Sequence, residues 1–160
     1  MRKNLLLLLG VFVFLSCKKS NSNDSGYTCP LNSATIGGLY KLTKVTKITI
    51  ASGNVTEIDA TTDINACELD DTYEFNSGSF LWTDAGTTCP GTVFSGTILW
   101  TLSGNNLTKD IQGYLPNPWN YIIMDDFIVQ QFDCASIVLQ KKVPQTATSE
   151  SGVRYYLKRP

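Results

Sequence analysis

The sequence predicts an all-β protein made of about eight to ten short antiparallel strands, the pattern of a barrel or a sandwich. Three observations lead to this expectation. Apolar and polar residues alternate along many short segments, which is the period-two pattern of strands. Residues typical of turns separate these segments. No long segment repeats its apolar residues at the helical period. The chain of 160 residues has room for one such domain.

The clearest pattern lies between Cys67 and Cys89. Apolar and polar residues alternate over 72–76 and again over 79–84, and the turn residues Asn76-Ser77-Gly78 lie between the two segments. Alternation on both sides of a turn that contains glycine is typical of a β-hairpin. We therefore expect a hairpin here with a cysteine just outside each arm.

Two further strands and a short polar segment precede this hairpin. Residues 30–36 indicate a turn or a single helical turn. Leu39–Ile50 is the first long strand, but its apolar phase slips on each side of Val45, which predicts a β-bulge or a strong bend. Val55–Ala60 returns as a second strand, and 61–71 is a polar connection.

The remaining strands follow the hairpin. Residues 112–120 and 144–152 lack a strand pattern and are expected to be loops. The expected strands are 92–102, 107–111, 121–132, 136–143 and 153–158.

The N-terminus has the pattern of an export signal. Arg2 and Lys3 precede the apolar run 5–15, which is shorter than the roughly 20 residues of a membrane-spanning helix. Phe14-Leu15-Ser16-Cys17 resembles the lipobox of bacterial lipoproteins, which implies that 1–16 is a signal peptide and that Cys17 is lipidated. The alternative is an ordinary signal peptide that ends near a cysteine. Residues 17–28, polar after Cys17, are expected to form a flexible tether, and 29–160 the folded domain.

Four cysteines remain if Cys17 carries lipid, and an even number in an exported chain indicates a disulfide framework. Four cysteines allow three connectivities. We favour Cys67–Cys89, because these residues flank one hairpin, and this choice leaves Cys29–Cys134. A metal cluster is disfavoured, because the chain has no histidine and no C-x-x-C pair.

Composition and motifs exclude several classes of function. The formal net charge is −1 and no basic stripe is present, which argues against a nucleic-acid partner. The chain contains no histidine and no phosphate-binding loop or G-x-S-x-G motif. We therefore expect no enzyme, no cofactor and no metal, and keep a hydrolase that uses paired carboxylates only as a remote option. Asp70-Asp71 is interpreted as a turn-capping pair and Asp125-Asp126 as a bulge or turn that interrupts an apolar strand, and neither as a calcium site.

Four segments resemble the lipocalin-like domain of bacterial lipoproteins. Tyr40 of Gly38-Leu39-Tyr40 takes the place of the tryptophan in the family's first strand. The other segments are Cys67-x-x-Asp70-Asp71-x-x-x-Phe75-x-x-Gly78 followed by Cys89, Gly96-x-x-x-Trp100-x-Leu102-x-Gly104-Asn105-x-Leu107, and 127–139. The resemblance covers about residues 36–158 and implies an antiparallel up-and-down β-barrel of about eight strands. It implies no fixed ligand.

Two functional hypotheses follow. The first is a monomeric, lipid-anchored barrel in the cell envelope, held to the outer membrane on its periplasmic face or at the cell surface, that binds a small apolar or amphipathic molecule. The second is a structural or interaction lipoprotein whose barrel is filled by its own aromatic residues. An internal cavity distinguishes the two. The candidate ligand residues at the barrel interior or mouth are Tyr40, Phe75, Trp82, Trp100 and Trp119.

A basic group near the C-terminus has two interpretations. It is either a solvated edge that discourages strand-to-strand aggregation, which we favour, or a face toward an anionic membrane. Its members are Lys141, Lys142, Arg154, Lys158 and Arg159.

Overall fold

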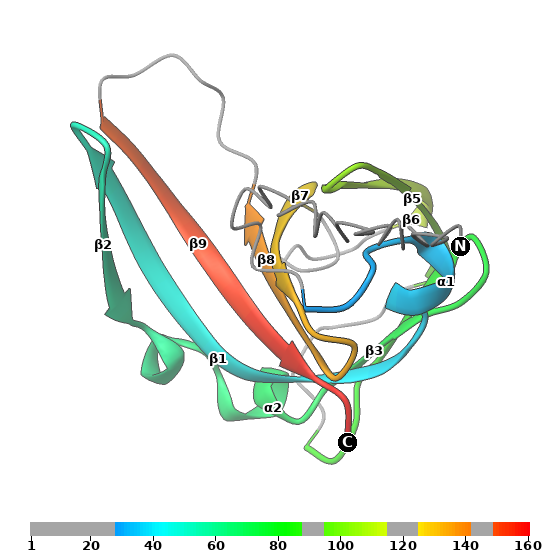
Figure 1. Cartoon of the computed structure of the whole chain (residues 1–160). Coiled ribbons are helices and arrows are strands. Elements are labelled where there is room, and N and C mark those ends of the chain that lie inside the picture. The colour runs from blue at the N-terminus through cyan, green and yellow to red at the C-terminus, as the bar shows by residue number, and fades with distance from the viewer. Residues whose placement is uncertain (1–27, 88–94, 115–124, 142–148) are drawn as a thin grey trace, which may run out of the picture.

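A computed structural model describes residues 28–87, 95–114, 125–141 and 149–160. In this part of the chain, nine strands form one antiparallel sheet, and pairing between β1 and β9 closes eight of them into a barrel (Figure 1). The strands are β1 (Gly38–Ala51), β2 (Asn54–Asp59), β3 (Thr72–Phe75), β4 (Ser79–Thr83), β5 (Ser95–Ser103), β6 (Asn106–Tyr114), β7 (Phe127–Phe132), β8 (Ser136–Lys141) and β9 (Ser149–Lys158). The predicted all-β barrel is thus confirmed.

The helices of the described residues are short. They are α1 (Ser33–Ile36), the 3-10 helix η1 (Thr61–Asp63) and α2 (Ala66–Leu69). Helix α1 is the helical turn expected within 30–36, and the other two lie in the expected polar connection between β2 and β3. None of the helices in the described ranges is long and apolar enough to span a bilayer.

Strand β1 belongs both to the barrel and to an extension of it. Its first residues, 38–41, pair with β3, whereas 46–51 pair with β2 along the same edge. The other edge of β1 pairs with β9 from Lys41 to Ala51. Residues 46–51, β2 and 149–154 of β9 therefore form a three-stranded extension, which we call the wing, and it projects from the barrel in Figure 1.

The phase slip predicted around Val45 is a β-bulge. The pairing of β1 with β9 shifts between Leu42 and Lys44, so Val45 keeps its side chain in the barrel core. Alternation beyond Val45 then places Thr46 and Ile48 on the outer face, where both are buried. The apolar residues of β1 thus cover two different faces of the sheet.

A polar network on the outer face ties the wing to the barrel wall. Glu57 of β2 accepts hydrogen bonds from Thr46 Oγ1 at 2.7 Å and from Arg154 Nη1 at 2.8 Å, and from the Tyr156 hydroxyl. Arg154 Nε also donates to Gln140 Oε1 at 3.0 Å. Arg154 is therefore a structural residue, and the expectation that it belongs to a solvated basic edge is wrong.

Two expected boundaries are corrected by strand pairing. The hairpin over 72–84 forms as predicted, with Tyr73 opposite Trp82 and Phe75 opposite Phe80. However, β6 continues to residue 114 and β9 begins at 149, although 112–114 and 149–152 were expected to be loops. Pairing with β5 and β1 supplies backbone hydrogen bonds there and outweighs the weak strand pattern. Residues 121–124, expected to begin a strand, lie outside the described ranges.

Candidate functional site at the α1 end of the barrel

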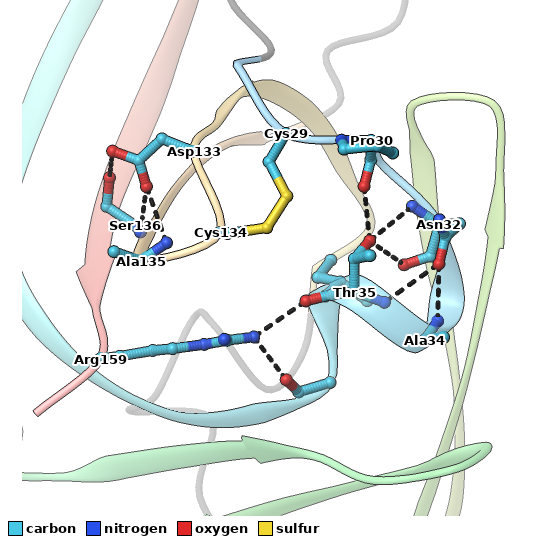
Figure 2. Close-up of a disulfide and its surroundings, with 12 residues drawn as sticks. Cys29, Pro30, Asn32, Ala34, Thr35, Asp133, Cys134, Ala135, Ser136 and Arg159 are labelled. Atoms are coloured by element: carbon cyan, nitrogen blue, oxygen red, sulfur yellow. Dashed lines mark hydrogen bonds between the residues drawn. A yellow bond between two sulfur atoms is a disulfide. The ribbon is translucent and has the colours of Figure 1, made fainter.

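One end of the barrel, here called the α1 end, carries α1, the start of β1, the end of β9 and the β3–β4, β5–β6 and β7–β8 turns. Asn32 begins α1 with a capping box: its Oδ1 accepts hydrogen bonds from the backbone of Ala34 and Thr35 at 3.0 Å, and Thr35 Oγ1 accepts from the Asn32 backbone (Figure 2). Ile36 ends the helix with its side chain fully buried in the core. The cap therefore fixes a very short helix over the barrel end.

A disulfide ties the segment before α1 to the barrel. Cys29 and Cys134 are bonded, with their Cα atoms 5.5 Å apart, which agrees with the expected pairing (Figure 2). The turn that holds Cys134 is shaped by Asp133, whose carboxylate accepts from the backbone and hydroxyl of Ser136. These hydrogen bonds lower the pKa of Asp133, and the bond from the Ser136 hydroxyl contributes most. Cys67 is also in a disulfide, but Cys89 lies outside the described residues, so their pairing stays a prediction.

The last turn of the chain is anchored at the same end. Arg159 Nη2 donates to the backbone oxygens of Thr35 at 2.8 Å and Gly37 at 2.5 Å, and to the Tyr40 hydroxyl at 3.1 Å. The Tyr40 hydroxyl in turn donates to the Ile36 backbone oxygen at 2.9 Å. Arg159 thus joins the C-terminus to α1 and β1, and it too is not a member of a solvated basic edge.

A half-open cavity of about 630 Å³ lies between α1, the β3–β4 turn and β5. Its volume falls in the range of small-molecule sites, about 300–1,000 Å³. Leu102 and Ala34 offer apolar surface, whereas Phe75 and Trp100 border the cavity with only 2% and 4% of their surface exposed. The other lining residues are Ser33, Gly37, Asn76, Ser77, Gly78 and Thr101. None of these residues carries a charge.

The aromatic floor of this cavity is held in place by the barrel. Trp100 Nε1 donates to the backbone oxygens of Asn76 at 2.8 Å and Ser79 at 2.9 Å. The Phe75 ring meets Trp100 edge-to-face at 5.4 Å between centroids. Because both side chains are almost fully buried, they support the base of the cavity from beneath and leave little of their own surface open to it.

The structure separates the five ligand-binding residues that the sequence suggested. Phe75 and Trp100 line the cavity, and Tyr40 is buried beside it with its ring 5.8 Å from that of Phe75. Trp82 is half-buried, and its indole donates to Asp71 Oδ2 at 2.8 Å. Trp119 lies outside the described residues. Sequence reasoning missed the polar rim, because turn serines and Asn76 give no signal beyond that of a turn.

In each acidic pair, one carboxylate accepts a hydrogen bond from the backbone of a segment 17 residues away in the sequence. Asp70 Oδ2 accepts from the Thr87 backbone at 2.8 Å, and Asp126 Oδ1 accepts from the backbone of β6. Asp71 is 1% exposed, and burial raises its pKa to about 6 despite the hydrogen bond from Trp82. Within the described ranges, no group of three acidic or thiol side chains is arranged to hold a metal ion.

The fold and this site define a class: a closed antiparallel β-barrel with an uncharged cavity at one end. Comparison of the chain with protein-family models, with curated proteins and with solved structures found no match.

Proposed function

We propose that this protein is a lipid-anchored, lipocalin-like binding module of the bacterial cell envelope that holds a small amphipathic molecule. The observation that supports this proposal is the cavity of about 630 Å³ at the α1 end. It lies on a disulfide-linked scaffold, so the lining residues are positioned before a ligand arrives.

The lining residues favour an uncharged ligand. Leu102 and Ala34 present apolar surface, and the polar lining residues Ser33, Ser77, Thr101 and Asn76 are uncharged. A buried charge needs a partner of opposite sign, and none of the lining residues supplies one. An apolar body with a neutral polar head fits this arrangement, and the absence of an acid or base from the lining favours binding over catalysis.

The anchor in this proposal is Cys17. Its thiol follows the lipobox-like Phe14-Leu15-Ser16, and lipid chains on this residue would hold the barrel at the outer membrane through the tether 17–28. Metabolic labelling with an alkyne palmitate tests the anchor. We expect the label on the wild-type protein and none on Cys17→Ser; equal labelling of the two proteins would contradict it.

The second candidate function is a structural or interaction lipoprotein, and the packing of the core favours it. Phe75 meets Phe80 at 4.9 Å between ring centroids, and Phe127 meets Tyr155 at 5.7 Å, so aromatic side chains fill much of the barrel with contacts to one another. A protein of this kind would present its outer face to an envelope assembly and carry no ligand.

Native mass spectrometry of protein purified from its own envelope distinguishes the two functions. We expect a bound mass that denaturation releases. Ser77→Trp should abolish that mass by filling the cavity, whereas Ser103→Trp, at an exposed serine that does not line the cavity, should retain it. The binding proposal fails if the mass is absent from the wild-type protein or survives in Ser77→Trp while the barrel remains folded.

A further inference from the structure

The point at which the tether joins the folded domain lies at the α1 end. The backbone N–H of Thr28 donates to the backbone oxygen of Phe132 at 3.0 Å. Cys29, the next residue, is bonded to Cys134 in the turn between β7 and β8 (Figure 2). A hydrogen bond and a covalent bond thus hold the start of the domain at this end of the barrel, so the tether acts on the barrel there.

The length of the tether limits how far the α1 end can lie from a membrane anchor. Thr28 follows Cys17 by eleven residues. A fully extended chain of this length spans at most about 40 Å, so the α1 end cannot lie farther than this from a lipidated Cys17. The opposite end can come as close to the bilayer only if the barrel turns over on its tether.

The exposed surface at the α1 end has little charge. Residues 32–34 of the α1 cap, 76–78 of the β3–β4 turn and 103–105 of the β5–β6 turn are all exposed and uncharged. Asp133 is the only acidic residue in the described turns at this end. Lys158, which is exposed, and Arg159 add two positive charges at the end of β9.

The opposite end of the barrel is acidic. It is formed by the β2–β3, β4–β5 and β6–β7 connections. Lys47 and Lys141 each pair with one carboxylate of these connections, and the acidic charge remains in excess among the described residues. The carboxylates belong to Asp63, Glu68, Asp70-Asp71, Asp84 and Asp125-Asp126.

We propose that the α1 end is the surface that lies against the bilayer, and that its partner is an anionic lipid surface. The inference rests on the lipid anchor of the proposed function. An anionic surface repels the carboxylates of the opposite end and attracts Lys158 and Arg159, over a distance of about 8 Å at physiological salt. The uncharged turns can approach the headgroups without the cost of desolvating a charge.

This orientation places the cavity on the bilayer side of the barrel. The cavity lies between α1, the β3–β4 turn and β5, which belong to the same end. A neutral amphipathic ligand would therefore enter it from the bilayer rather than from the aqueous phase.

The test is photo-crosslinking of the full-length protein in its own envelope. p-Benzoylphenylalanine, which bonds to nearby C–H groups on irradiation, replaces one exposed residue at a time. The positions are Ser103 and Ala135 at the α1 end, and Ala66 and Thr83 at the opposite end. Mass spectrometry of the purified, denatured protein measures the lipid adducts. We expect at least about fivefold more lipid adducts at the α1 end than at the opposite end.

Two sets of variants test the anchor and the charge separately. Cys17→Ser should lose the lipid adducts at all four positions. Ser103→Glu with Asn105→Glu adds two carboxylates to the α1 end and should lower the adducts at Ala135 at least about twofold, because an anionic surface then repels this end. The matched change of the same two residues to glutamine should leave these adducts unchanged.

The proposal is overturned if lipid adducts are equally frequent at the two ends, are absent from both, or are replaced at the α1 end by adducts to a protein. Palmitate labelling reports the anchor and native mass spectrometry reports the ligand. A failure of the proposed function is therefore distinguished from a wrong orientation of the barrel.

Discussion

Replacing Lys109 with methionine measures the free energy that the barrel loses by burying an ammonium group. Methionine is similar in length and shape, so Lys109→Met keeps the contacts with Phe80 and Phe127 and removes only the titratable amine. Because the folded state lowers the pKa of Lys109, protons bind the unfolded chain more tightly. The wild-type protein is therefore penalised most below pH 7, and the penalty fades as pH rises toward 10.5.

The size of this penalty follows from the two pKa values. A pKa of about 7 in place of 10.5 corresponds to at most about 5 kcal/mol at pH 6. At pH 9 the folded amine is neutral and the unfolded amine is still mostly protonated, so about 2 kcal/mol remains. Because methionine does not titrate, the pH dependence of its effect follows from these two pKa values alone. We expect Lys109→Met to raise the free energy of unfolding by about 3 kcal/mol more at pH 6 than at pH 9.

Urea unfolding followed by tryptophan fluorescence, with the disulfides intact, measures both values. The decisive quantity is the change between the two pH values, because packing effects of the substitution cancel in it. Lys158→Met is the matched control on the exposed surface and should alter stability by less than about 0.5 kcal/mol at either pH. An effect of Lys109→Met that is the same at pH 6 and pH 9 would refute the argument that the amine is desolvated.

Three further substitutions test the α1 end by the same unfolding assay. Arg159→Met removes the hydrogen bonds to the backbone of Gly37 and its neighbours, and should cost about 2–3 kcal/mol; a loss below about 0.5 kcal/mol would contradict the anchoring role. Trp100→Phe removes two hydrogen bonds from the indole and should cost about 1–3 kcal/mol, and unchanged stability would show that the indole is not held as described. The double replacement Cys29→Ser with Cys134→Ser opens a loop with a sequence separation of 105 and should cost about 2–5 kcal/mol; a loss below about 0.5 kcal/mol would contradict a stabilising role for this bond.

The sequence predicted those parts of the fold that depend on local pattern. The slip in phase at Val45 indicated the bulge, because side chains of a strand alternate strictly and a slip requires an extra residue. Alternation over 72–84 indicated the central hairpin for the same reason. The pairing of Cys29 with Cys134 was predicted as what remained once Cys67–Cys89 was favoured across the hairpin, and the structure shows that this bond joins two segments at the same end of the barrel.

Contacts between distant segments could not be predicted in this way. Arg159 bonds to residues more than 100 positions earlier, and only closure of β1 on β9 brings them together. The cavity is formed by a turn, a helix cap and a strand end, and none of these has a pattern that indicates a ligand. Lys109 did leave a signal: it lies two residues from both Leu107 and Ile111, so strand alternation places it on their buried face.

The continuity of β1 and β9 determines how the wing opens in hydrogen exchange. Both strands run from the wing into the barrel wall, and they pair with each other from Lys41 to Ala51. The ladder between them therefore has no hinge at which the wing could unfold by itself. Amides of β1 and β9 in the wing are expected to exchange with the global opening of the barrel, whereas β2, fully exposed and outermost, exchanges earlier. The cooperative unit thus includes the parts of β1 and β9 that lie in the wing, and only β2 opens independently of it.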